Sequence, residues 1–327
     1  MLSRPTGDKT KTAGSGSLQM VRRIHPTQTP MKATRFFFFT ACTFIFGTFC
    51  SISTPAQTIS FADIQKLPKP PADHRLTYGN DPLQFGELRL PKSQGKNPVV
   101  IVVHGGCWFA EYDLNHVAAF SDALTKLGVA TWTIEYRRIG DKGGAWPGTF
   151  QDVAKGADFL REVGKKYHLD MQRVIVIGHS AGGQLALWLA ARKSLPKSSE
   201  LYSPNPIRLK GVISLAGISD LKKYRPNCDD SVHKLLGGSP EQFGERYQQT
   251  SPIDLLPLRV PIRLIHGAKD RIVPLDLGKE FEAAAKKRGD DVQLSILETA
   301  GHFELISPLA PAWKTVEQNV RDLLKLK

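Results

Sequence analysis

Three residues of the types that cooperate in acyl transfer stand far apart in the chain: Ser180, Asp270 and His302. A serine hydroxyl is a poor nucleophile, and it becomes reactive when a base within hydrogen-bond reach takes its proton and a third group orients that base. We therefore predict Ser180 as the nucleophile, His302 as the general base and Asp270 as the acid. Such a set attacks a carbonyl, forms an acyl-enzyme and lets water release the acyl group.

Ser180 is the central residue of the pentapeptide 178–182, which reads Gly-His-Ser-Ala-Gly. The β-branched run 174–177 before it predicts a buried strand, and the run 184–192 after it is rich in helix formers. A direct passage from strand to helix makes a sharp turn, and small residues two positions from its apex let the strand and the helix approach. This context favours a nucleophile turn over an incidental serine in a glycine-rich turn.

The oxyanion of such a reaction needs backbone N–H donors. We predict the amide of Ala181, directly after the nucleophile at a helix N-terminus, as one donor. The glycine pair 105–106 lets the main chain approach a substrate closely, so we predict the second donor in the Gly106–Cys107 segment. The alternative for the glycine pair is an ordinary tight turn.

Several neighbouring residues compete for these roles. Asp220 is a second candidate for the acid, and its simpler role is to cap a short helix. Glu304 is too close to His302 in the sequence to orient it, and we expect it at the surface or behind the site. We expect packing or bracing roles for the remaining histidines of these motifs, His104, His179 and His266.

The elements that must position these residues alternate between strands and helices. We expect strands at residues 75–78, 84–90, 98–103, 129–136, 174–177, 211–215, 261–266 and 292–297. We expect helices at residues 115–127, 149–167, 184–192, 275–288 and 312–326. This order predicts an α/β fold, with a mostly parallel central sheet, helices on both faces and an N-terminal antiparallel hairpin. Reactive groups gather at the carboxyl ends of such strands.

Five motifs together resemble the α/β-hydrolase superfamily and, more narrowly, its HGGxW branch. They are His-Gly-Gly-Cys-Trp at 104–108, Tyr-Arg-Arg at 136–138, Gly-His-Ser-Ala-Gly at 178–182, His-Gly-Ala-Lys-Asp at 266–270 and Gly-His at 301–302. The branch includes small esterases of the feruloyl/acetylxylan type, arylformamidases and relatives of the prolyl oligopeptidase catalytic domain. The resemblance covers residues 75–327. It implies the α/β-hydrolase fold, the chain order Ser, Asp, His and a reaction that requires no metal or organic cofactor.

The first 56 residues differ in composition from the rest, and we expect them to form a leader. Residues 31–56 have a basic start, an apolar run and small residues at the end, which is the pattern of a secretory signal peptide. We expect translation to start at Met31, residues 1–30 to be an over-extended start, and residues 57–327 to form a single catalytic domain, secreted or periplasmic. The alternative is an uncleaved membrane anchor, although the apolar run 36–52 is short for a span.

The charge of the chain is partly a property of this leader. The formal net charge is +13, and removal of the leader's seven basic residues and one acid leaves +7. The remaining basic residues are scattered, and no basic patch is interleaved with aromatic residues, which argues against a nucleic-acid partner. The charged fraction of 23% and hydrophobic fraction of 41% are those of a folded domain.

Two cysteines, Cys107 and Cys228, remain after the leader. Export permits a disulfide, and we expect both cysteines at the same edge of the sheet. The sequence is therefore compatible with a Cys107–Cys228 disulfide or with two buried free thiols. Three aromatic residues in loops near the site, Trp108, Tyr112 and Trp146, form an apolar or sugar-stacking substrate wall, or they anchor their loops. We expect the insertion 217–258 to be a lid or pocket wall.

These features favour a serine esterase that acts outside the cytoplasm on small esters or acylated saccharides. An amide or peptide hydrolase with the same machinery is the second reading. A non-catalytic binding protein of the same fold is the third, and it predicts a missing member of the triad. We expect no stable membrane span after processing, and the oligomeric state stays open.

Overall fold

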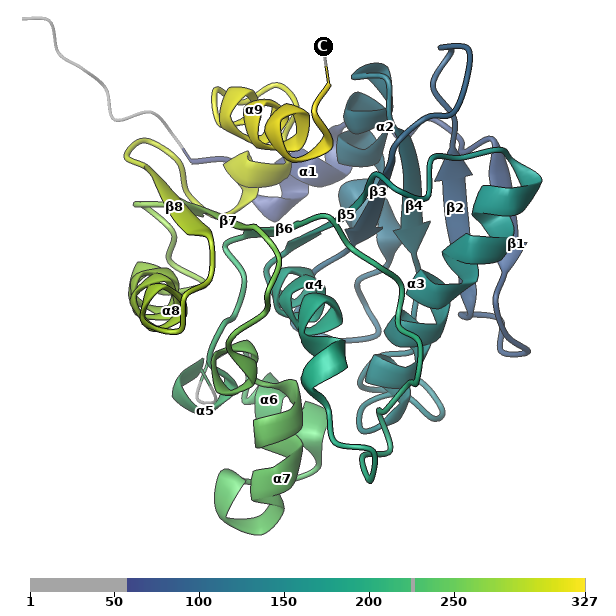
Figure 1. Ribbon diagram of the computed structural model, residues 1–327. Helices are drawn as coiled ribbons and strands as arrows, with labels where there is room; N and C mark the ends of the chain where they lie inside the picture. Colours follow the sequence, from purple (N-terminus) through teal and green to yellow (C-terminus); the bar gives the residue numbers. More distant parts are fainter. Residues whose placement is uncertain (1–57, 225–226, 327) are drawn as a thin grey trace, which may run out of the picture. The chain divides into compact units, whose positions relative to one another are not determined.

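A computed structural model describes residues 58–224 and 227–326, and an eight-stranded sheet runs through them (Figure 1). The strand order is β1-β2-β4-β3-β5-β6-β7-β8. β1 pairs with β2 and β2 with β4 in antiparallel fashion, and all other neighbours are parallel. The strands are β1 His74–Thr77, β2 Phe85–Arg89, β3 Val99–Val103, β4 Ala130–Ile134, β5 Val174–His179, β6 Val212–Leu215, β7 Ile262–Gly267 and β8 Val292–Leu297.

One helix precedes the first strand, and the others lie between later strands or follow the last strand. The α-helices are α1 Phe61–Lys66, α2 Ala118–Lys126, α3 Gly148–Lys166, α4 Ala181–Ala191, α5 Leu221–Tyr224, α6 Ser231–Leu236, α7 Pro240–Thr250, α8 Leu275–Lys287 and α9 Trp313–Leu324. The short 3-10 helices are η1 Leu114–Val117, η2 Arg192–Ser194, η3 Pro252–Leu255 and η4 Phe303–Ile306. The predicted α/β fold is confirmed, and each predicted strand is present to within two residues at either end.

The central strands are apolar throughout because the sheet separates two cores. In β3, Val99, Ile101 and Val103 belong to one core, whereas Val100 and Val102 belong to the other. Successive side chains of a strand point to opposite faces, so a strand covered on both sides is apolar at every position. Helices α3, α4 and α8 cover the first face, and α1, α2 and α9 cover the second (Figure 1).

The strand register brings the loops of the predicted site together. Val103 at the end of β3 pairs with Gly178 in β5, so the glycine pair 105–106 and Ser180 leave the sheet side by side. Gly267 at the end of β7 pairs with Leu297 at the end of β8, so the next two loops also leave together. The carboxyl edge of the sheet is therefore the place where the predicted chemistry assembles.

Two parts of the fold are not among the predicted elements. α1 lies between the expected leader and the first predicted strand. It begins with a capping box, in which the side chains of Ser60 and Asp63 each accept the other residue's backbone N–H. The insertion 217–258, for which no helix is predicted, contains α5, α6, α7 and η3. α7 also begins with a capping box, from Ser239 and Gln242, with Pro240 as its first residue.

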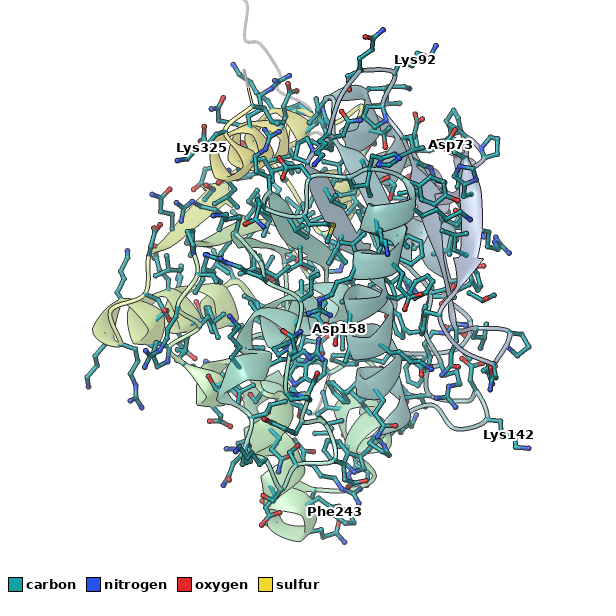
Figure 2. The ribbon with its side chains drawn as sticks, turned by 45° about the vertical axis from the view of Figure 1, so that its right-hand side comes forward. Asp73, Lys92, Lys142, Asp158, Phe243 and Lys325 are labelled. Carbon is teal, nitrogen blue, oxygen red and sulfur yellow. A yellow bond between two sulfur atoms is a disulfide. The ribbon has the colours of Figure 1, made fainter. Side chains whose placement is uncertain are left out.

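The predicted leader, residues 1–56 with a signal peptide at 31–56, lies outside the described residues. Among the helices of 58–224 and 227–326, none combines the length and the apolar character that a bilayer crossing requires. Basic side chains are spread over this part of the chain: Figure 2 shows Lys92, Lys142 and Lys325 extending from three separate regions.

Candidate active site

Ser180 forms the turn between β5 and α4. Its backbone has φ 57° and ψ −121°, a conformation that a residue with a side chain rarely adopts. The turn is tight because the motif glycines touch: a Cβ on Gly178 would collide with the backbone of Gly182, and one on Gly182 with the carbonyls of Val103 and His104. Strained backbone of this kind clusters at functional sites. The predicted strand–turn–helix around Ser180 is therefore present.

His302 and Asp270 meet at the ends of β8 and β7. His302 Nδ1 lies 2.6 Å from Asp270 Oδ2, and the Asp270 side chain is fully buried. The other oxygen, Oδ1, accepts the backbone N–H groups of Ile272 at 2.8 Å and Val273 at 2.9 Å. Burial raises the pKa of this carboxyl, but His302 and the two N–H groups lower it further, so its pKa lies below its usual value. An ionised Asp270 keeps the proton of His302 on Nδ1 and leaves Nε2 free as a base.

His179 joins the histidine loop to the nucleophile turn. Its ring centroid lies 4.4 Å from that of His302, and its Nε2 lies 3.0 Å from the His302 carbonyl oxygen. A carbonyl only accepts, so the proton of His179 is on Nε2. Since His179 directly precedes Ser180, this bond places the loop of His302 against the turn. The predicted nucleophile, base and acid thus lie in adjoining loops, and their catalytic roles stay a prediction.

The predicted oxyanion loop lies against the same turn. A Cβ on Gly105 would lie 2.6 Å from the His179 carbonyl oxygen and 3.1 Å from the Ser180 Cβ, so only glycine fits there. Gly106, Cys107 and Trp108 follow with φ 110°, 50° and 60°, three successive left-handed residues. Within the described segments, the backbone N–H groups of Cys107 and Ala181 donate to no protein acceptor. They are therefore available to an oxyanion, whereas that role for Gly106 also stays a prediction.

His104 braces this loop from inside, as expected. The ring of His104 is buried, and its Nε2 lies 3.0 Å from Glu135 Oε1. The same ring stacks on that of Tyr136, with the ring centroids 4.4 Å apart. The Tyr136 hydroxyl donates to the His104 carbonyl at 2.9 Å. Burial raises the pKa of Glu135, but His104 and Arg138 outweigh it, so the pKa lies below its usual value. A charged, buried cluster thus fixes the start of the loop.

The rival residues have structural partners. Asp220 Oδ1 accepts the backbone N–H of Lys223 at 3.0 Å, so it caps α5, which was its simpler role. His266 Nε2 donates to the Val273 carbonyl at 2.9 Å, which confirms a structural role. Glu304 is buried rather than at the surface, and it lies behind the histidine loop.

The predicted substrate wall is only partly available. Trp108 is fully buried, and its Nε1 donates to Gln184 Oε1 at 3.2 Å, so the prediction that it contacts substrate is wrong and its indole anchors the loop. Tyr112 packs on Gly106. Trp146 lines a cavity of about 470 Å³ with the start of α7, where the Arg246 guanidinium lies 5.3 Å from its ring. Substrate contacts by Tyr112 and Trp146 stay predictions.

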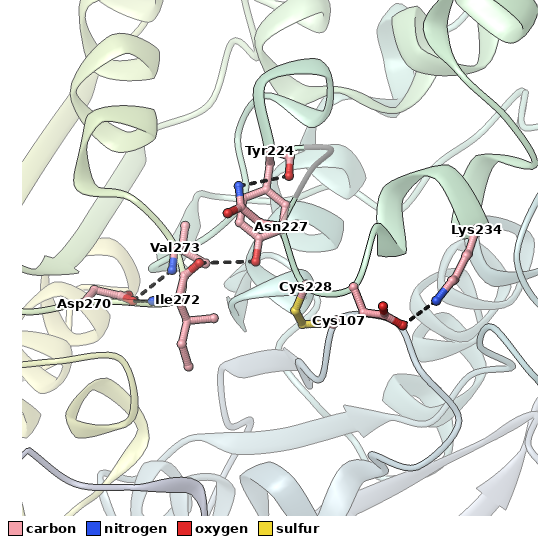
Figure 3. Close-up of a disulfide and its surroundings, with 9 residues drawn as sticks. Cys107, Tyr224, Asn227, Cys228, Lys234, Asp270, Ile272 and Val273 are labelled. Atoms are coloured by element: carbon pink, nitrogen blue, oxygen red, sulfur yellow. Dashed lines mark hydrogen bonds and ion pairs between the residues drawn. A yellow bond between two sulfur atoms is a disulfide. The ribbon is translucent and has the colours of Figure 1, made fainter.

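A disulfide joins Cys107 of the predicted oxyanion loop to Cys228 of the insertion, with their Cα atoms 6.2 Å apart (Figure 3). This resolves the choice that the sequence leaves open. The insertion also contacts the loop of Asp270, because the Tyr224 hydroxyl donates to the Ile272 carbonyl at 3.3 Å (Figure 3). No group of three or more histidine, cysteine, aspartate or glutamate side chains is placed to hold a metal ion in the residues that are described.

Known proteins are similar to this chain in sequence. The BD-FAE family model matches residues 87–284, more than half of the chain, a range that includes Ser180 and Asp270. An isoprenylcysteine alpha-carbonyl methylesterase of Arabidopsis thaliana is 26% identical over 245 residues, which cover 70% of this chain and 56% of the relative. The chain spans about half the length of the curated relatives it matches.

Solved structures show the same fold. A truncated carbohydrate esterase from gut microbiota has a TM-score of 0.68 at 20% identity, covering 78% of this chain and 99% of the other. An acetyl ester-xyloside bifunctional hydrolase from Caldicellulosiruptor lactoaceticus has a TM-score of 0.64 at 21% identity, covering 77% of this chain and 97% of the other.

Proposed function

The chain belongs to the BD-FAE family, an α/β-hydrolase esterase family, and from that premise we propose that it is a serine carboxylesterase working by two-step acyl transfer. The observation that carries the proposal is the 2.6 Å hydrogen bond between His302 Nδ1 and Asp270 Oδ2, in a loop bonded to the residue before Ser180. This arrangement presents an unprotonated imidazole nitrogen beside a strained serine turn.

In the first step, His302 Nε2 takes the hydroxyl proton while Ser180 Oγ attacks the ester carbonyl carbon. The carbonyl oxygen becomes an oxyanion, and the N–H groups of Cys107 and Ala181 stabilise it. Asp270 remains ionised because its pKa is lowered, so it stabilises the imidazolium. His302 then protonates the departing alcohol, and an acyl-Ser180 ester remains.

In the second step, His302 removes a proton from water, and the hydroxide attacks the acyl-Ser180 carbonyl. The same two N–H groups hold the second oxyanion. Collapse of this intermediate returns the proton to Ser180 and releases the carboxylic acid. Apart from the substrate and one water molecule, these steps use only the chain's own residues.

For the substrate, we propose small esters and acylated saccharides. The names of the fold neighbours suggest this class, and Trp146 offers an aromatic face beside a cavity with polar side chains. We also propose that the protein works outside the cytoplasm, since a disulfide between its oxyanion loop and its insertion persists in oxidising compartments.

The test is hydrolysis of p-nitrophenyl esters from acetyl to octanoyl by the protein from Gln57 onward. We expect turnover of the short esters, and a Ser180→Ala variant that is slower by about three orders of magnitude or more. Acetylated and feruloylated saccharides are the next substrates, and amide analogues separate an esterase from an amide hydrolase. A folded wild-type protein that hydrolyses none of these esters would refute the proposal.

A further inference from the structure

The segment 58–67, which we call the N-terminal strap, lies directly after the predicted leader and contains α1. It reaches the loop of His302, more than 200 positions away in the sequence. The backbone N–H of Ile59 donates to Glu304 Oε1 at 2.6 Å. The other oxygen, Glu304 Oε2, accepts the backbone N–H of Gly301 at 3.0 Å. A single buried carboxylate therefore ties the strap to both sides of His302.

A second contact runs through the side chain of Phe61, in the first turn of α1. Its ring centroid lies 5.7 Å from that of Phe303, the residue after His302, and 5.2 Å from that of Tyr112, which packs on Gly106. Phe61 thus touches the neighbours of the predicted base and of the predicted oxyanion loop. Such ring pairs contribute stabilising energy beyond their buried area.

The third contact of Phe61 is with His116, at 5.4 Å between ring centroids. His116 Nε2 lies 3.0 Å from His179 Nδ1, and His179 Nε2 donates to the His302 carbonyl. Since the neutral His179 carries its proton on Nε2, its Nδ1 accepts, and His116 Nε2 donates. His116 Nδ1 is then the bare nitrogen, which agrees with its having no partner among the described residues. The strap therefore covers one end of a hydrogen-bonded chain that ends on His302.

From these contacts we propose that the N-terminal strap is a positioning element for His302, with Glu304 and Phe61 as its positioning residues. The inference rests on the proposed esterase function. Catalysis requires His302 to stay aligned with Ser180 and Asp270, and His302 lies in the short loop between β8 and η4. The strap adds to the bonds from Asp270 and His179, through Glu304 on one side and through the ring contacts on the other.

A physical consequence is that the N-terminal strap matters for turnover rather than for substrate binding. Misplacement of a reacting group by about 1 Å costs on the order of 100-fold in rate. Neither Glu304 nor Phe61 belongs to the predicted nucleophile, base, acid or oxyanion donors, so their loss acts through the position of His302.

The experiment compares three variants of the protein from Gln57 onward on p-nitrophenyl acetate. Glu304→Gln keeps the shape of the side chain but turns one acceptor oxygen into a donor that faces an N–H group. Phe61→Ala removes the ring, and Phe159→Ala is its matched control: Phe159 is similarly half-buried, on α3, with its ring 6.1 Å from Trp132. We expect kcat to fall about tenfold or more in Glu304→Gln and Phe61→Ala, with KM little changed. In the control Phe159→Ala, kcat should equal that of the wild type.

A second readout does not depend on turnover. We expect the proton in the short bond between His302 Nδ1 and Asp270 Oδ2 to give a far-downfield proton NMR signal, which is assigned by its absence in His302→Ala. We expect that signal to shift or broaden in Glu304→Gln and Phe61→Ala and to stay in place in Phe159→Ala. Phe61→Leu, which restores apolar bulk, should recover part of both readouts.

The outcomes separate the inference from the function on which it rests. If wild type hydrolyses esters but Glu304→Gln and Phe61→Ala match Phe159→Ala in kcat and in the NMR signal, the strap does not position His302 and the inference is overturned. If wild type is inert on every ester, the proposed function fails and the inference fails with it. If kcat falls only in proportion to lost folded protein, as judged by thermal melts, the strap is merely structural.

Discussion

The two sides of the candidate site are built differently. On the side of the base, His302, Asp270, His179 and Glu304 are buried, and each is hydrogen-bonded to a named partner. On the side of the insertion, the Cys107–Cys228 disulfide and the hydrogen bond from Tyr224 to Ile272 link the insertion to the loops that contain Cys107 and Asp270. From this difference we predict separate roles: the buried side fixes the reacting groups, and the insertion side contacts the substrate. Changes to the first should lower kcat, and changes to the second should alter stability or KM.

The largest effect is expected at Asp270. Asp270→Asn keeps an oxygen for the N–H groups of Ile272 and Val273, but it presents an NH₂ group to His302 Nδ1 and so favours the wrong tautomer. We expect kcat on p-nitrophenyl acetate to fall about 10⁴-fold with the fold intact. Asp220→Asn is the matched control and should keep the wild-type kcat, because Asp220 caps α5. Equal losses in both variants would make the side chain beside His302 irrelevant.

The disulfide tests the insertion side. Cys107→Ser combined with Cys228→Ser opens a link between residues 121 positions apart. We expect the free energy of unfolding, measured by urea denaturation, to fall by about 2–4 kcal/mol. Because the backbone N–H of residue 107 remains, kcat should fall less than tenfold. A loss of kcat as large as that of Asp270→Asn would mean that the insertion, and not the buried side, fixes the reacting groups.

The buried side should also carry a pH signature. Burial, with smaller effects of the nearby His104 and His302, lowers the pKa of His116 from 6.5 to about 3. As the pH falls below 6.5, the unfolded chain takes up this proton before the folded one does, so stability falls until the pH approaches 3. His116→Gln, which keeps a donor to His179, should reduce the slope of unfolding free energy against pH by up to about 1.4 kcal/mol per pH unit. Parallel curves for the two proteins across this window would contradict the assignment.

The smallest effect is expected at Trp146. Trp146→Ala removes an aromatic face from the cavity at the start of α7. We expect KM for an acetylated saccharide to rise about three- to tenfold, while kcat and KM for p-nitrophenyl acetate stay constant. Equal effects on both substrates would mean that Trp146 helps to position the reacting groups. The two sides of the site would then not have separate roles.

Much of this architecture follows from local sequence. The apolar runs 99–103 and 174–177 predict central strands because both faces of the sheet are covered. The pentapeptide around Ser180 predicts its own turn, since the glycines at 178 and 182 are required for strand and helix to touch. Asp270 and His302 are predicted from residue type, strand ends and chain order, and the structure adds the bond between them.

What the sequence does not predict depends on contacts between distant segments. α1 has six residues, too few for a periodic pattern, and it is held by Glu304 and by the rings around Phe61. The burial of Trp108 follows from its bond to Gln184, which no local pattern encodes. The role of His116 depends on His179 in the same way. The capping boxes of α1 and α7 are local signals that our sequence analysis did not use and that mark where these two helices begin.

The most direct test of the central claim is to identify the residue that reacts as the nucleophile. The protein from Gln57 onward is treated with a sulfonyl fluoride, and residual ester hydrolysis is followed together with peptide mass spectrometry. The account predicts one sulfonyl group per chain, on the peptide that contains Ser180, with activity lost in step with labelling and no labelling of Ser180→Ala. Labelling of a different residue in step with the loss, or full labelling of Ser180 with hydrolysis retained, would contradict it.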